Sequence, residues 1–129
     1  MPSQNNTGRQ YDKQHAVTQV ATAALVAHRL IAYDGGYATS AGGAKDAQGV
    51  SETSAAIGEA LPVVTGYSYP VQAEEAIAFG AYVKPGTDGK AAVGAADDHC
   101  GRALGAATQA DQLIEVQIVK HQHPAPSGG

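Results

Sequence analysis

The chain has 129 residues and a net charge of −4, a length that suits one domain with tails. Its 8 Lys and Arg residues are scattered, whereas a nucleic-acid-binding domain usually carries a basic stripe. No apolar run approaches the roughly 18 residues of a membrane span, so we expect neither nucleic acid nor a membrane among its partners.

The N-terminal segment and the cysteine content indicate where the protein is made. Residues 1–14 are polar and without periodicity, which predicts an extended arm, and residues 1–13 lack the apolar segment of a signal peptide. The lone Cys100 rules out an internal disulfide and suits a reducing compartment. We therefore expect synthesis in a cytoplasm.

In the first half of the chain, segments rich in β-branched and aliphatic residues predict strands. These strands are expected at 15–20, 25–33, 50–53 and 61–67. Frequent Ala leaves a helix over 19–31 as the alternative. Asp34-Gly35-Gly36 predicts a turn. Pro62 indicates an edge position or a strand start, because proline donates no ladder hydrogen bond.

The second half alternates turns and short strands more clearly. One helical turn is expected at 73–77, and the turn residues at 85–89 predict a hairpin between strands at 81–84 and 90–93. A further strand is expected at Arg102. In the closing strand Ile114, Val116 and Ile118 share one face, because successive side chains point to opposite sides.

About seven to nine short strands spaced by turns predict an all-β fold, either a small β-barrel or a β-sandwich. We expect the β-domain to span 15–119, between the arm at 1–14 and a polar C-terminal tail at 120–129. The tail is expected to have no means of packing, so His121 and His123 would bind metal only adventitiously.

The core of such a domain would be thin. Of the 43% hydrophobic residues, 26 are Ala, whereas Val, Ile, Leu and Phe together number 22. Stabilisation scales with buried apolar area at roughly 25 cal/mol per Å², and Ala contributes little area. We therefore expect a folded domain that gains stability from oligomerisation or from docking on a larger surface.

The motifs of nucleotide and metal binding are missing or incomplete. Gly86-Thr87-Asp88-Gly89-Lys90 is followed by Ala91 and lacks the glycine spacing of a phosphate-binding loop. Asp97-Asp98-His99-Cys100 is the densest cluster of possible metal ligands, but no further Cys or His pair accompanies it. A polar loop is the better interpretation, and no metal or cofactor is expected.

The residues that could support catalysis are also poorly arranged. A Cys100 nucleophile would need a histidine base, and the neighbouring His99 would point to the opposite face of a strand. Glu74 and Glu75 are adjacent and more typical of a solvated turn than of an acid–base pair. We therefore expect a protein that is not an enzyme.

Tyrosine is the one side chain that suggests a binding surface. Five tyrosines lie in or beside predicted strand ends, at positions 33, 37, 67, 69 and 82. Tyr combines apolar area with a polar tip and is enriched at interfaces, although half-buried rim residues of a barrel would look the same.

The order of these segments resembles the capsid cement, or head decoration, proteins of tailed bacteriophages, some of which have carried a recombinase-like label. The nucleotide-binding residues of a recombinase are absent here. The resemblance covers roughly 15–119 and is carried by glycine and apolar spacings at 30–36, 61–66, 73–83, 88–91, 101–104 and 113–118.

The resemblance implies a virion structural protein on the outer capsid surface. Such proteins bind the expanded phage head and stabilise contacts between major capsid subunits, often as homotrimers, and a terminal arm reaches onto neighbouring subunits. The expected partners are therefore the major capsid protein and other copies of this chain. Candidate interface residues are Gln4, Asn5, Asn6, Arg9, Tyr11, Tyr37, Tyr67 and Tyr69.

The alternative function is a carbohydrate- or receptor-binding β-domain on the virion. It is suggested by the tyrosines, but sugar sites usually present Trp or several coplanar aromatic rings, and the chain has no Trp.

Overall fold

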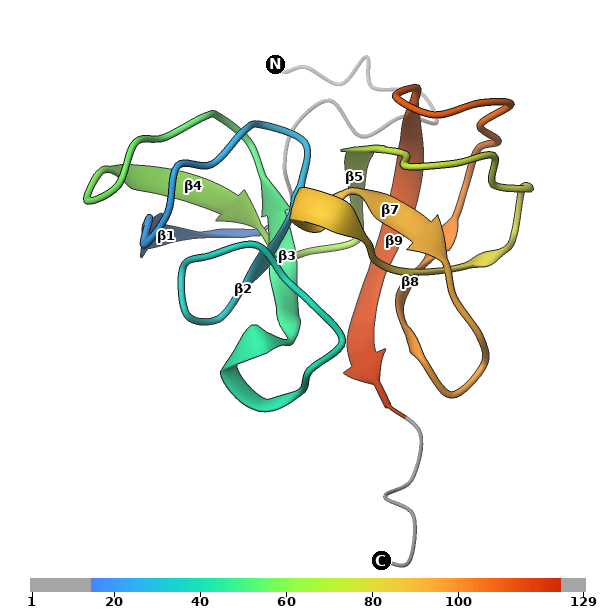
Figure 1. Cartoon of the computed structure of the whole chain (residues 1–129), viewed down its shortest axis with the longest axis horizontal. Coiled ribbons are helices and arrows are strands. Elements are labelled where there is room, and N and C mark those ends of the chain that lie inside the picture. The colour runs from blue at the N-terminus through green and yellow to red at the C-terminus, as the bar shows by residue number, and fades with distance from the viewer. Residues whose placement is uncertain (1–14, 124–129) are drawn as a thin grey trace, which may run out of the picture.

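The computed structural model describes residues 15–123, which form two antiparallel β-sheets packed against each other (Figure 1). The predicted all-β class is confirmed, and of the two architectures the structure is a sandwich rather than a closed barrel. Two short 3-10 turns, η1 (Gly43–Lys45) and η2 (Thr87–Gly89), are the only helical elements among the described residues. None of the described helices is long and apolar enough to cross a membrane.

The first sheet has four strands in the order β1-β4-β3-β2. These strands are β1 (Ala16–Val20), β2 (Leu30–Ala32), β3 (Ala47–Ser51) and β4 (Ala60–Val64). All neighbouring strands are antiparallel, and a register shift interrupts the β2–β3 pairing between Ile31 and Ala32.

The second sheet has five strands in the order β5-β9-β8-β6-β7. They are β5 (Ser68–Gln72), β6 (Tyr82–Pro85), β7 (Ala91–Val93), β8 (His99–Ala103) and β9 (Leu113–Gln122). The long β9, red in Figure 1, runs the length of this sheet between β5 and β8.

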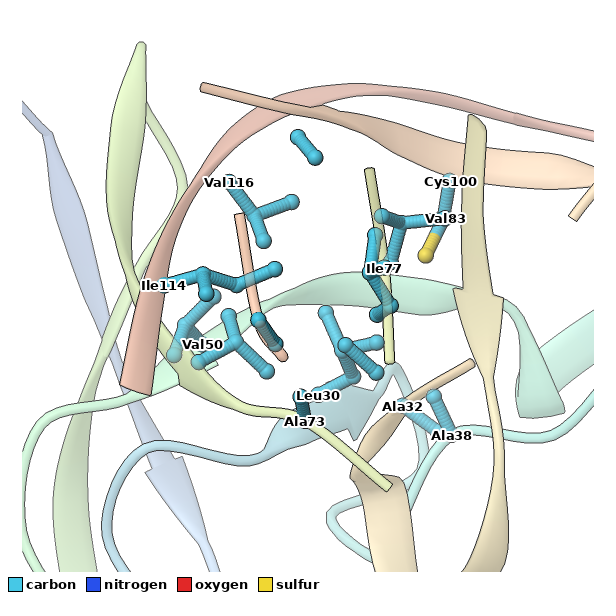
Figure 2. Close-up of a cluster of buried hydrophobic side chains, with 14 residues drawn as sticks. Leu30, Ala32, Ala38, Val50, Ala73, Ile77, Val83, Cys100, Ile114 and Val116 are labelled. Atoms are coloured by element: carbon cyan, nitrogen blue, oxygen red, sulfur yellow. The ribbon is translucent and has the colours of Figure 1, made fainter. Parts of the chain in front are cut away.

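The main core lies between the two sheets (Figure 2). Leu30 and Val50 from the first sheet point towards Val83, Ile114 and Val116 from the second. Alanines complete the cluster, which is how a chain with few large aliphatic residues still buries its sheet faces.

A second, smaller core covers the opposite face of the first sheet. Ile31, between Leu30 and Ala32 of the main core, packs there with Leu61 and Val63 because alternate residues of a strand point to opposite sides. Loop residues Ala21, Leu25 and Ala55 close this cluster. Both faces of the first sheet are therefore buried at β2, β3 and β4, whereas β1 is largely exposed.

Several predicted elements need correction. The strand expected at 25–33 is limited to Leu30–Ala32, and the helix considered over 19–31 does not form. The helical turn at 73–77 is wrong, since Ala73 and Ile77 make isolated β-bridges to Ala91 and Ala107. Strand β5 was not predicted; it contains Pro70, which is tolerated because the strand lies at a sheet edge.

Pro62 does not mark an edge or a strand start. It lies in the middle of β4, which is flanked by β1 and β3. The proline is tolerated because β3 has already ended at Ser51, and the carbonyl of Pro62 still accepts the N–H of Glu52 at 3.1 Å.

Part of the polar tail expected at 120–129 belongs to a strand. Strand β9 continues to Gln122, and His121 is buried, so the expectation that these residues have no means of packing is wrong for 120–123. The β6–β7 hairpin and the inward face of Ile114 and Val116 are confirmed.

Candidate functional site

Cys100 lies in β8 and belongs to the main core, where its thiol is almost completely buried (Figure 2). Burial raises the pKa of this thiol to about 12, and the negative charges of Asp98 and Asp46 act in the same direction. A thiol with so high a pKa stays protonated and is a poor nucleophile. Cys100 is therefore a core residue.

The possible metal ligands at 97–100 contact different partners. The Asp98 carboxylate lies 3.6 Å from Lys84 Nζ, whereas the His99 ring contacts the ring of Tyr82, with centroids 4.5 Å apart. Nδ1 of His99 lies 3.0 Å from the carbonyl oxygen of Ala95, which closes the turn before β8. These side chains therefore organise a turn, in agreement with the interpretation as a polar loop.

Glu74 and Glu75 both accept backbone hydrogen bonds from the β6–β7 hairpin. Glu74 Oε1 accepts the N–H of Thr87 at 2.6 Å, and Glu75 Oε2 accepts the N–H of Val93 at 2.8 Å. The two carboxylates therefore anchor different parts of one hairpin, and neither is directed at the other.

Asp46, His121 and His123 are the one group of three potential metal ligands within residues 15–123, with donor atoms within 4.8 Å of one another. His123 Nε2 lies 2.5 Å from Asp46 Oδ1. The N–H of Ala47 donates to His121 Nδ1 at 3.0 Å, so this nitrogen is unprotonated. The sequence-based interpretation missed this cluster because Asp46 is distant in sequence.

The cluster is not arranged as a metal centre. The two imidazole rings are stacked, with centroids 4.4 Å apart and planes inclined by 22°. Two histidines that share Zn²⁺ each place it in the ring plane at about 2.0–2.1 Å from nitrogen, which nearly parallel rings cannot do. The lone pair of His121 Nδ1 is also already used by Ala47. The cluster instead joins the end of β9 to the start of β3.

The edges of a β-sheet are natural binding sites, because their outer N–H and C=O groups are unpaired. Three of the four edges here are covered by the chain itself. Segment 73–75 covers β7 through the Glu74 N–H and Ala91 carbonyl at 2.8 Å, and segment 36–38 covers β2 through the Ala38 N–H and Leu30 carbonyl at 2.9 Å. The carbonyl of His28 covers β5 by accepting the N–H of Gln72 at 3.0 Å.

The fourth edge, β1, is open over part of its length. Hydrogen bonds from Thr65 to His15 and from Ala21 to Glu59 mark the bonded pairs at both ends of the β1–β4 ladder. Because bonded and non-bonded pairs alternate in an antiparallel ladder, the N–H and C=O groups of Ala16, Thr18 and Val20 point away from β4. Within residues 15–123, no group bonds the outward backbone of Ala16 or Thr18.

The turn after β2 closes the far end of this edge. Thr22 donates to the carbonyl of Gly35 at 3.1 Å, and a Cβ on Gly35 would collide with the carbonyl oxygen of Val20. The Gln19 side chain donates to the carbonyl of Tyr33 and to the Gln48 side chain, both at 2.9 Å. The open part of β1 is therefore its first half.

A groove of about 490 Å³ is lined by residues of both sheets. Val17 and Thr65 line it on the side of the first sheet, together with Tyr33, and β9 contributes the wall from Ile118 to His121. Val17 is 40% exposed and Tyr33 is 57% exposed, so solvent reaches apolar surface in the groove. We call this groove the β1 groove, because Val17 of β1 lines it.

The predicted interface residues lie in different surroundings. Tyr37 packs on the smaller core, where its hydroxyl accepts the N–H of Val26 at 2.9 Å. Tyr69 stacks on the ring of His28, and Tyr67 is exposed in the turn between β4 and β5. Gln4, Asn5, Asn6, Arg9 and Tyr11 lie outside the described residues.

The β1 groove was not predicted from the sequence. Strand β1 was expected, but a sequence shows neither which strand lies at a sheet edge nor which edge the chain covers.

Comparison with known proteins identifies relatives of this fold. Residues 10–118 match the family model described as phage cement protein. No curated protein sequence matches the chain.

One solved structure with a similar fold is described as the head fiber gp8.5 N base in bacteriophage phi29. It superposes with a TM-score of 0.66 at 21% sequence identity, and the match covers 85% of this chain and 98% of that one. At this identity the likeness establishes the shared fold.

Proposed function

The chain belongs to the phage cement protein family, and on that basis we propose that it binds the outer surface of the expanded phage head and stabilises contacts between neighbouring major capsid subunits. The match to the family over residues 10–118 carries this proposal. Cement proteins are structural components of the phage head rather than enzymes, which agrees with the buried thiol of Cys100 and the structural use of Glu74 and Glu75.

The exposed apolar side chains of the domain are available for contact with a larger partner such as the phage head. Within residues 15–123 nine large hydrophobic side chains are exposed, and Ile57 and Phe79 are each 71% exposed. Docking on a larger surface would bury such side chains, and each Å² of apolar area removed from water contributes roughly 25 cal/mol. Many copies on one shell would also raise the effective concentration of each contact, so modest individual affinity suffices.

Co-sedimentation with phage heads tests this proposal. Purified protein is mixed with expanded heads that lack it and, as a control, with unexpanded heads. We expect a fixed ratio of this protein to the main shell protein on expanded heads and increased resistance of those heads to heat. A folded protein that stays in the supernatant with expanded heads would refute the proposal.

The homotrimer implied by the family resemblance stays a prediction, which the mass of the purified protein in analytical ultracentrifugation tests. The carbohydrate-binding alternative gains no support from the tyrosines, because Tyr37, Tyr69 and Tyr82 each contact a different partner: Val26, His28 and Arg102.

A further inference from the structure

We propose that the contact between the end of β9 and the start of β3 opens when His121 binds a proton, while the rest of the sandwich stays folded. The contact is made by Asp46, Ala47, His121 and His123, which we call the β3–β9 junction. It joins the first sheet to the long strand of the second. This inference concerns the protein in solution and does not rest on binding to the phage head.

The junction accepts only the neutral form of the His121 ring. Nδ1 accepts the N–H of Ala47 at 3.0 Å, so a proton on Nδ1 would place two donors against each other. Nε2 is buried without a hydrogen-bond partner among the described residues, and the side chain is only 2% exposed. A buried charge without hydrogen bonds is costly, so the protonated ring is expected to leave the junction.

The charged and titratable groups that face His121 do not offset this cost. Asp46, whose Oδ1 lies 3.7 Å from Nδ1, and Asp98 favour the charged ring, but the same oxygen of Asp46 is already bonded to His123 Nε2. His123 and His99 disfavour the charged ring. Burial is the largest influence and lowers the pKa of His121, so the closed junction binds the proton less readily than free histidine does.

The end of β9 has fewer partners than the rest of the strand. Among the described residues, its pairing with β5 ends at the hydrogen bond from the Ile118 N–H to the Tyr67 carbonyl at 2.7 Å. On the other side a register shift interrupts the pairing with β8 between His99 and Gly101. Segment 119–123 is therefore held by an irregular ladder and by the junction, which favours local opening over unfolding of the whole sandwich.

The β1 groove brings solvent close to the junction. Asp46, Ala47 and His121 are among the residues that line it, and Val17 on another wall is 40% exposed. Displacement of the His121 ring towards the groove would therefore hydrate its charge without disturbing the main core, to which His121 does not belong.

Amide hydrogen exchange followed by NMR tests this inference on the unmodified protein. The N–H of Ala47 reports on the junction, and the N–H of Ile77, bonded to the Ala107 carbonyl at 2.9 Å, reports on the main core. Protection factors of both amides are measured at pH 7.5, 6.5 and 5.5, without urea and in urea below the unfolding transition. Local opening exposes little surface and responds weakly to urea, whereas global unfolding responds strongly.

We expect the protection of Ala47 to fall by up to about tenfold for each pH unit below 6.5, because the open junction binds a proton that the closed one does not. This fall should be insensitive to urea, and Ile77 should stay more strongly protected than Ala47 at every pH. Protection of Ala47 that does not depend on pH, or that responds to urea as Ile77 does, would overturn the inference.

The variant His121→Asn identifies the group that titrates. The asparagine oxygen can accept the N–H of Ala47 and binds no proton in this pH range, so the protection of Ala47 in the variant should be the same at pH 7.5 and 5.5. An equal fall in the variant and in the unmodified protein would assign the opening to another group and would also overturn the inference. The pH and urea comparisons on the unmodified protein decide the question if the variant does not fold.

Discussion

The backbone N–H of Ala47 donates to Nδ1 of His121 at 3.0 Å, and this hydrogen bond joins the first sheet to the last strand of the second. It defines the protonation state of the imidazole, because a nitrogen that accepts from an amide cannot carry a proton. The other nitrogen, Nε2, is buried without a hydrogen-bond partner among the described residues. His121 is therefore held neutral in the folded protein.

This arrangement predicts that the folded protein becomes less stable as the pH is lowered. Burial lowers the pKa of His121 below its ordinary value of 6.5; His123 and His99 add to this effect, whereas Asp46 and Asp98 oppose it. Below pH 6.5 the unfolded chain therefore binds a proton that the folded protein does not. As the pH is lowered from 6.5 towards the pKa of His121 in the folded protein, the free energy of unfolding should decrease by at most about 1.4 kcal/mol per pH unit.

Urea unfolding at pH 7.5 and 5.5 measures this loss, with His121→Asn as the matched control. The Asn side-chain oxygen can accept the N–H of Ala47 but does not titrate. Other groups, such as Asp34, whose pKa is lowered by its hydrogen bond with Lys45, are the same in both proteins and cancel. An equal loss in both proteins would contradict the role assigned to His121.

Gly49→Ala should destabilise the first sheet. A Cβ at position 49 would overlap the backbone carbonyl of Val64 on the neighbouring strand, and backbone atoms cannot move aside cheaply. We expect the free energy of unfolding to fall by about 1–3 kcal/mol or more. Gly105→Ala is the control, because the nearest atom to its added Cβ, the backbone nitrogen of Glu115, is 3.8 Å away. Equal effects of the two substitutions would count against this explanation.

Ser51→Ala should also be costly, because this hydroxyl serves two backbone groups in a buried position. Ser51 Oγ accepts the N–H of Arg29 at 3.0 Å and donates to the carbonyl of Val26 at 2.8 Å. We expect a loss of about 1–3 kcal/mol in thermal or denaturant unfolding. Ser54→Ala removes an exposed acceptor of the Ala27 N–H, which water can replace, so its effect should be clearly smaller.

Cys100 should resist thiol reagents in the folded protein. Its side chain is buried and the pKa is raised to about 12, so thiolate is nearly absent at neutral pH. We expect no labelling by iodoacetamide over hours in native buffer and complete labelling in concentrated guanidinium chloride, followed by mass spectrometry. Rapid labelling of native protein would show that β8 opens far more readily than its core position indicates.

The sequence predicts those parts of the fold that depend on local patterns. The alternation of Ile114, Val116 and Ile118 places the inner face of β9, and the turn residues at 85–89 place the β6–β7 hairpin. The apolar and glycine spacings also suffice to indicate the family. In each case neighbouring residues carry the signal, because side-chain direction in a strand alternates with period two.

The pairing of strands that are distant in the sequence was harder to predict. Strand β5 was missed because it contains Pro70, and proline is compatible with a strand only at an edge that the sequence does not reveal. Pro62 suggested an edge or a strand start, but β4 lies between β1 and β3. The proline is tolerated there because its missing N–H falls where β3 has already ended. Which strands become neighbours depends on contacts between distant segments, and no local pattern encodes it.

Composition and period-two alternation by themselves determined that this is a small all-β domain with a thin, alanine-rich core. Only the tertiary structure decided that His121 meets Asp46, that the chain covers three sheet edges, and that the outward backbone groups of Ala16 and Thr18 find no partner among residues 15–123. The reason is geometric: a strand's sequence specifies which way its side chains point, whereas the order of strands in a sheet decides which backbone groups find partners.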